Sequence, residues 1–221
     1  FYVDPNLNGI DWKKVGELHY PKILSAPGDE AFWKSLDNMV GELGDSHTRV
    51  LSAKQYAYFK QKAAYTIGLS VADLQGELIV TGVGVDSPAE KAGIIKGNRL
   101  LKIEGMDAND WWRMQLSMVR KNSSERAQAK SVKRLLNSGD LDAPTDRIAL
   151  QVERNDGTIF DVTLQRAELP QVDSLNGKML DEQIGYLRMN SFDASLGKQI
   201  ETTYDKVREA KGLIIYLRGN G

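Results

Sequence analysis

Residues 66–105 read TIGLSVADLQGELIVTGVGVDSPAEKAGIIKGNRLLKIEG, and they decide the fold of the segment around them. Positions 78–85 are apolar and β-branched, which predicts a strand. Ser87-Pro88-Ala89-Glu90 is typical of a capping box, with serine at the N-cap and glutamate three residues later. Gly93 ends this helix after about one turn. A second short strand is expected at 99–103, so the stretch predicts a strand, a one-turn helix and a strand.

This pattern does not indicate a nucleotide or metal site. Gly82 and Gly84 have the spacing of a dinucleotide-binding loop, but a third glycine is absent and the helix is too short for a crossover. The chain also lacks a His-Glu-x-x-His zinc motif, a Gly-Lys-Ser/Thr phosphate loop and a Gly-x-Ser-x-Gly elbow. We therefore predict neither a cofactor nor a metal.

The central stretch resembles a PDZ domain. Gly68-Leu69-Ser70-Val71 is similar to the carboxylate-binding loop of that family, and 87–100 is similar to its core motif. The resemblance implies that an unstructured C-terminal tail binds as an added strand, with its carboxylate held by loop amides. The residues expected to bind this peptide are Thr66, Ile67, Gly68, Leu69 and Ser70. We expect Gly68 to be kept free of a side chain so that the ligand can approach the backbone.

Composition limits the classes of function. Apolar residues make up 41% and charged residues 27% of the 221 residues, and the net charge is −1. This balance is that of a globular protein and gives no indication of a nucleic-acid partner. The absence of cysteine excludes thiol catalysis and disulfides. No apolar run approaches a membrane span, no signal peptide is found, and the oligomeric state is not indicated.

The flanking segments predict an α+β multidomain protein. Helical periodicity predicts a helical N-terminal domain over 1–63, with Asp11 capping a helix and Pro21 breaking or kinking it. The PDZ-like β-barrel or sandwich is expected over 64–168. It includes a helical insertion at about 109–146 and a hairpin turning at Asn155-Asp156-Gly157. Met114 and Met118 are expected to line a pocket for the last side chain of the peptide.

The final segment, 169–221, predicts the first βαβ unit of a parallel α/β core. A strand is expected at 184–189, a helix at about 194–210, and a continuous apolar strand at 213–217. One such unit cannot cover both faces of its own sheet, so we expect partner elements in a longer protein. The glycine-rich turn at 218–221 follows the last strand, where sites of open α/β sheets lie.

The order of these parts resembles the carboxy-terminal processing, or tail-specific, serine peptidases and their tricorn-like relatives. The residues that carry this resemblance are Tyr2-Val3-Asp4-Pro5, Asp11-Trp12, Leu43-Gly44-Asp45-Ser46-His47-Thr48, the PDZ core, 184–188 and 212–221. The resemblance implies His47 as general base with Ser46 as its orienting neighbour, and Gly219 and Gly221 in the oxyanion-stabilising turn. It also implies a periplasmic or extracellular location.

The same resemblance places the nucleophilic serine after the Arg-Gly-Asn-Gly turn, where this chain has no counterpart. We therefore expect an amino-terminal fragment of a serine endopeptidase that is inactive alone. Members use a Ser–Lys dyad or a Ser–His arrangement, and the sequence leaves both open. The alternative is a non-catalytic PDZ scaffold that binds peptides, in which His47 would be an ordinary solvated histidine.

Overall fold

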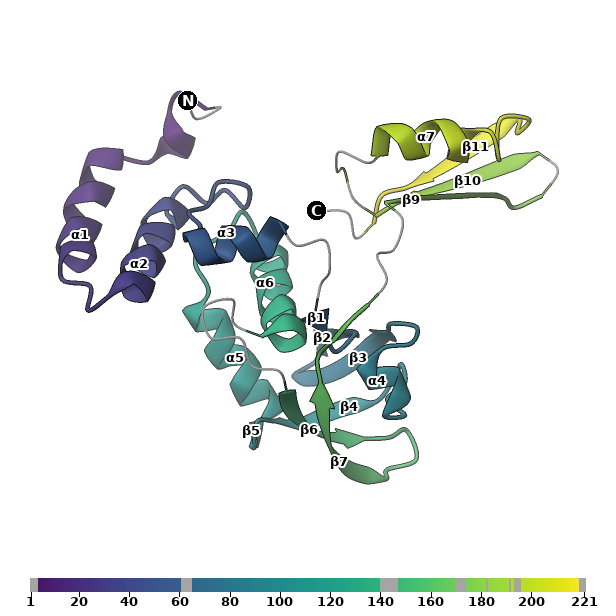
Figure 1. Cartoon of the computed structure of the whole chain (residues 1–221), viewed down its shortest axis with the longest axis horizontal. Helices are drawn as coiled ribbons and strands as arrows, with labels where there is room; N and C mark the ends of the chain where they lie inside the picture. The colour runs from purple at the N-terminus through teal and green to yellow at the C-terminus, as the bar shows by residue number, and fades with distance from the viewer. Residues whose placement is uncertain are drawn as a thin grey trace. The chain divides into compact units, whose positions relative to one another are not determined.

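The computed structural model describes residues 4–60, 65–139, 147–169, 174–181, 183–190, 192 and 196–218. The chain forms two compact units, Phe1–Leu169 and Pro170–Gly221 (Figure 1). The boundary expected at 63 lies inside the first unit, and the division into three domains stays a prediction.

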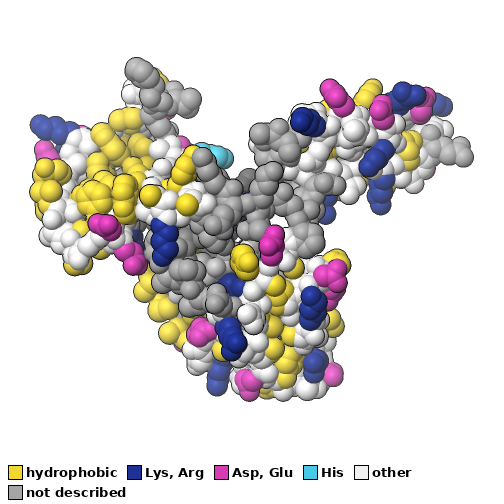
Figure 2. Space-filling model, in the orientation of Figure 1, with side chains coloured by type: hydrophobic (Ala, Val, Ile, Leu, Met, Phe, Trp, Pro, Cys, Tyr) yellow, Lys and Arg dark blue, Asp and Glu magenta, His cyan; other side chains and the backbone are white. Residues whose placement is uncertain are grey.

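The first unit begins with a series of helices. They are the 3-10 turn η1 (Leu7–Gly9), α1 (Trp12–Leu24), α2 (Asp29–Gly41) and α3 (Ala53–Lys60). Of these, α1 and α2 pack on one another. The Asp11 side chain accepts a hydrogen bond from the Lys14 backbone N–H at 3.2 Å, so the predicted cap is confirmed. Of the two effects expected of Pro21, a break is wrong, because α1 continues to Leu24 despite the missing N–H donor, and a kink stays a prediction. Hydrophobic side chains gather on the surface of this helical part (Figure 2), where Leu18, Leu24 and Phe32 are exposed.

An antiparallel sheet forms the centre of the first unit. Its strand order is β2-β3-β4-β6-β7, and the short β5 (Met106–Asp107) pairs with β4. The main strands are β2 (Leu69–Leu74), β3 (Glu77–Val83), β4 (Arg99–Ile103), β6 (Arg147–Glu153) and β7 (Ile159–Gln165). A separate pair joins β1 (Tyr65–Thr66) to β8 (Ala167–Glu168). Strand β2 therefore lies at one edge of the sheet and β7 at the other.

The local signals of the central stretch are confirmed. Helix α4 (Pro88–Lys91) begins after Ser87, whose Oγ accepts a hydrogen bond from the Glu90 N–H at 3.1 Å. The Glu90 carboxylate accepts in turn from the Asp86 N–H at 2.7 Å, which completes the cap one residue earlier than a standard box. Strands β6 and β7 pair antiparallel on either side of the predicted 155–157 turn.

Helices α5 (Ala108–Met118) and α6 (Glu125–Ser138) share the core with the sheet. Trp111 and Trp112 of α5 and Val132 and Leu136 of α6 are buried in one cluster with the strand residues. Helix α5 contacts β3, β4 and β5, whereas α6 contacts β1 and β2 (Figure 1). Helix α6 therefore stands beside the edge strand β2.

The second unit is a small three-stranded sheet with one helix. Its strands have the order β11-β10-β9, where β10 and β11 are parallel and β9 is antiparallel to β10. The elements are β9 (Leu175–Met179), β10 (Ile184–Met189), α7 (Leu196–Tyr204) and β11 (Gly212–Tyr216). The predicted βαβ unit is confirmed, while β9 was not predicted. Leu213 and Ile215 of β11 remain 46% and 54% exposed, so this unit does not cover its own apolar strand.

Within the described part of the chain, no helix is both long and apolar enough to cross a membrane. The same residues contain no cluster of three or more His, Cys, Asp or Glu side chains that could hold a metal ion.

Candidate functional site

The edge strand β2 and helix α6 form the first candidate site. Along β2, Leu69 and Val71 are buried while Ser70 is exposed, which is the alternation expected of a strand packed on one face. No strand pairs with the outer edge of β2 among the described residues, where α6 lies instead. An edge strand offers unpaired N–H and C=O groups, so an extended peptide can add to it.

The loop amides expected to hold a carboxylate are bonded to acceptors within the protein. The Ile67 N–H donates to the Asn137 backbone oxygen at 3.2 Å. The Gly68 N–H donates to Thr66 Oγ1 at 3.0 Å, and the Leu69 N–H donates to Asn137 Oδ1 at 2.7 Å. The loop thus has the predicted row of N–H groups, and Asn137 and Thr66 occupy them.

Gly68 is required by the fold itself. Its φ is +79°, in the left-handed region, and an added Cβ would lie 2.3 Å from Ser87 Cβ. The sequence interpretation gave this glycine a role toward the ligand. The structure gives it a role in the fold as well, because Ser87 at the N-cap of α4 fills the space where a side chain would go.

Asn137 was not predicted from the sequence. It lies in the last turn of α6, and its Nδ2 donates to the Leu69 carbonyl oxygen at 2.7 Å and to the Lys133 carbonyl oxygen at 2.9 Å. A polar residue near the end of an amphipathic helix is ordinarily a solvated residue or a cap, so the sequence alone carried no signal for a contact across 68 positions.

Arg166 contacts the C-terminal end of α6, the same turn that carries Asn137. Its side chain is buried, and its guanidinium donates to the backbone oxygens of Asn137 at 2.8 Å, Arg147 at 3.0 Å and Leu136 at 3.2 Å. Carbonyl groups in the last turn of a helix have no partner within the helix. Arg166 therefore satisfies the end of α6 and ties it to the start of β6.

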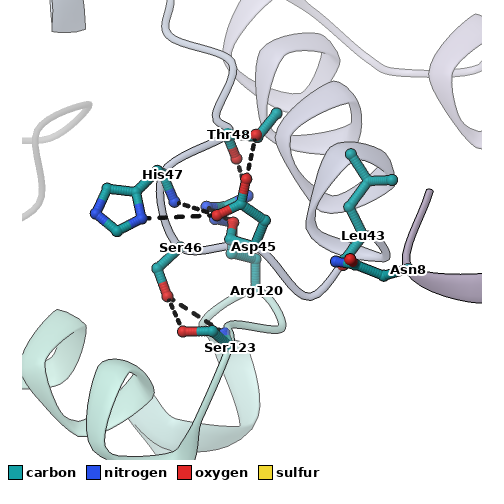
Figure 3. Close-up of polar contacts among 8 residues, drawn as sticks. All are labelled: Asn8, Leu43, Asp45, Ser46, His47, Thr48, Arg120 and Ser123. Atoms are coloured by element: carbon teal, nitrogen blue, oxygen red, sulfur yellow. Dashed lines mark hydrogen bonds and ion pairs between the residues drawn. The ribbon is translucent and has the colours of Figure 1, made fainter. Parts of the chain in front are cut away.

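The second candidate site is the polar loop after α2 (Figure 3). His47 and Thr48 both converge on Asp45: the His47 backbone N–H donates to Asp45 Oδ1 at 2.9 Å, and the Thr48 hydroxyl donates to Oδ2. His47 Nδ1 lies 3.7 Å from Asp45 Oδ1, and the imidazole is 92% exposed. The Thr48 hydroxyl, followed by the His47 N–H, lowers the pKa of Asp45, so the carboxylate is kept ionised beside the imidazole.

The Ser46 side chain makes its described polar contacts with Ser123 and not with His47. Its hydroxyl hydrogen-bonds the Ser123 hydroxyl and accepts from the Ser123 backbone N–H at 3.2 Å (Figure 3). The residue beside His47 that could orient it is Asp45, which the sequence interpretation missed although it stands only two positions away. A carboxylate paired with a histidine is the usual arrangement for orienting a base.

Arg120 holds this loop against the end of α5. Its side chain donates to the backbone oxygens of Thr48 at 2.8 Å and Asp45 at 3.2 Å, and it lies 3.7 Å from the Asp37 carboxylate. Burial lowers the pKa of Arg120, and the attraction of Asp37 opposes that effect. The loop carrying His47 is therefore fixed to the central domain.

A cleft of about 460 Å³ lies within the first unit, between the helical part and helices α5 and α6. Met118 lines it together with Trp33 and Val50. Met114 instead packs partly buried against the core cluster. The expectation that both methionines line a pocket for the last side chain of the peptide stays a prediction.

Gly219 and Gly221, expected in an oxyanion-stabilising turn, lie outside the described residues. His47 lies in the first unit, and that turn follows β11 in the second.

No family profile matches the chain. The chain is 24% identical over 196 residues to the carboxy-terminal processing protease CtpA of Bacillus subtilis, covering 84% of this chain and 36% of that protein. It is 24% identical over 231 residues to the chloroplastic C-terminal processing peptidase of Tetradesmus obliquus, covering 100% of this chain and 48% of that peptidase.

Among solved structures, mature CPAF complexed with lactacystin matches 94% of this chain and 50% of its own, with a TM-score of 0.56 and 15% identity. This likeness concerns the fold alone. The relatives found by sequence are named as carboxy-terminal processing proteases. The chain spans less than half the length of the Bacillus subtilis and Tetradesmus obliquus proteins.

Proposed function

We propose that the chain is part of a serine endopeptidase and captures unstructured C-terminal tails along strand β2. The observation that carries this proposal is the edge of β2, which has α6 beside it and a row of loop N–H groups at its start. Such an edge binds a peptide through main-chain hydrogen bonds, and loop N–H groups suit a terminal carboxylate.

The direction of the backbone groups supports binding on the α6 side. The N–H and C=O of Leu69 both point to Asn137 of α6. Because backbone groups alternate along a strand, those of Val71 and Asp73 point to the same side. The register irregularity of this strand pair falls between Gly82 and Val80 of β3, so it leaves the alternation along β2 intact. A peptide would pair with β2 through these groups.

The catalytic assignment is part of the same proposal. His47 would act as general base, with Asp45 rather than Ser46 as its orienting partner. Gly219 and Gly221 would stabilise the oxyanion, and the nucleophile would come from outside this chain. A Ser–Lys dyad remains the competing arrangement. We also propose domain boundaries at 63 and 168, specificity for C-terminal tails, and a periplasmic or extracellular location.

The alternative, a non-catalytic peptide-binding scaffold, has weaker support. Both interpretations use the β2 edge. The relatives that match most or all of this chain are named as proteases or peptidases, and the match to the Tetradesmus obliquus peptidase includes the segment that carries His47.

Calorimetry tests the binding proposal with two peptides of identical sequence that end in an apolar residue. One peptide has a free carboxylate and the other an amidated terminus. The free terminus should bind more tightly, since a charged acceptor forms the stronger hydrogen bonds with loop N–H groups. Equal affinity for the two peptides, or no binding of either, would contradict the proposal.

A further inference from the structure

The side chain of Asn137 occupies the edge of β2 as a strand would. Its Oδ1 accepts from the Leu69 N–H at 2.7 Å, and its Nδ2 donates to the Leu69 C=O at 2.7 Å. A neighbouring strand in a sheet makes this same pair of bonds to one residue. One carboxamide thus satisfies both outward groups of the first residue of β2, where the carboxylate of a bound tail is expected.

The N–H groups of Gly68 and Ile67 in this loop are also hydrogen-bonded within the protein. Thr66 Oγ1 accepts from the Gly68 N–H at 3.0 Å and donates to Asn137 Oδ1 at 3.2 Å. The backbone oxygen of Asn137 takes the Ile67 N–H at 3.2 Å. The three successive amides from Ile67 to Leu69 therefore depend on one helix residue and one threonine.

We propose that Asn137 is an internal competitor for the peptide, so that a C-terminal carboxylate must displace its carboxamide from Leu69 before it can bind. This inference rests on the proposed capture of tails along β2. The closed arrangement lowers the apparent affinity, because only the fraction of molecules with Asn137 displaced can accept the ligand. Capture would therefore require a peptide with a free C-terminal carboxylate, and internal peptide segments, which lack one, would not bind.

Positively charged residues of α6 near this site favour binding of an anionic ligand over the neutral Asn137 side chain. Lys133 lies one helical turn before Asn137 on α6, and residues four apart share a helix face. Arg126 is two turns further back and acts electrostatically on Lys133. A carboxylate approaching Leu69 would gain from these cations, whereas the neutral carboxamide that it replaces would not.

Two substitutions at one position test the inference in the 221-residue chain. The probe is a short unstructured peptide that ends in Ala-Val with a free carboxylate, titrated by calorimetry at neutral pH. Asn137→Ala should tighten its binding roughly 5- to 30-fold, the equivalent of one or two net hydrogen bonds lost from the closed state. Asn137→Asp should weaken binding, because its charge stands where the ligand carboxylate goes. Lys130→Arg, exposed on the same helix and with its positive charge kept, is the control and should bind as the unmodified chain does.

These measurements distinguish failure of the competitor role of Asn137 from failure of tail capture along β2. Unchanged or weaker binding by a folded Asn137→Ala variant overturns the competitor role while leaving tail capture in place. If Asn137→Ala does not fold, the nearly isosteric Asn137→Asp decides, and affinity equal to that of the unmodified chain overturns the inference. Absence of binding by the unmodified chain and by all variants overturns tail capture and the inference together.

Discussion

At the scale of single residues, Gly68 shows how the fold constrains the proposed site. We expect Gly68→Ala to lower the free energy of unfolding more than Gly76→Ala. Both glycines have positive φ, at +79° and +83°, but only Gly68 has Ser87 within 4 Å of an added Cβ. The difference should be about 1–3 kcal/mol, the usual cost of overpacking. Urea denaturation of the two variants measures it, and equal losses would show that Ser87 does not restrict this position.

His47 is the second residue whose role can be measured directly. In the complete protease, His47→Ala should lower kcat by about 10²–10⁴-fold without changing the melting temperature, since a positioned base contributes that much. Its side chain is 92% exposed, so the fold does not depend on it. Ser46→Ala is the matched control and should retain most activity, because Ser46 bonds Ser123 rather than the imidazole. Near-normal turnover of the His47 variant would favour a Ser–Lys dyad.

At the scale of elements, Arg166 connects α6 to the sheet. Arg166→Leu should cost about 2–4 kcal/mol of stability, because it removes the guanidinium donor from the carbonyl groups of Leu136, Asn137 and Arg147, of which the Leu136 bond is buried and the other two are part-buried. Arg113→Leu is the control, since Arg113 is exposed and pairs only with Asp110 among the contacts described. Thermal or urea unfolding compares them. A loss no larger than that of the control would show that α6 is held by its apolar face alone.

The sequence predicted those elements whose signals are local. The Ser87–Glu90 cap, the 155–157 turn and the parallel strands β10 and β11 follow from neighbouring residues or from a long apolar run. The contact between Asn137 and Leu69 joins residues 68 positions apart, and no periodicity specifies such a pairing. For the same reason, the sequence indicated helices near 109–138 without placing α6 beside β2. Asp45 could have been found, because a carboxylate two residues from a histidine is itself a local signal.

At the scale of the whole molecule, the apolar strand β11 of the second unit is left exposed. Leu213, Ile214 and Ile215 of β11 are exposed in a sheet of three strands, although such a run is typical of a strand covered on both faces. The homologues extend well beyond the matched length, so a further segment is available in them to cover this strand.

In the proposed arrangement the nucleophile comes from outside this chain. The chain by itself should therefore not hydrolyse peptide bonds, because the proposed base and oxyanion donors do little for acyl transfer without a nucleophile. Casein should remain intact after prolonged incubation, and a serine-directed phosphonate should label no residue. Reproducible labelling of one serine would refute this expectation and would place the nucleophile within the 221 residues.

In the proposed mode of capture, a tail adds to β2 on its α6 side. Amide chemical-shift mapping measures this binding site residue by residue, during titration of the chain with a peptide that has a free carboxylate. We predict the largest changes at Leu69, Val71 and Asp73 and along α6, with little change at β7, the opposite edge of the same sheet. Changes centred on β7 or on α1 and α2, with β2 unaffected, would contradict it.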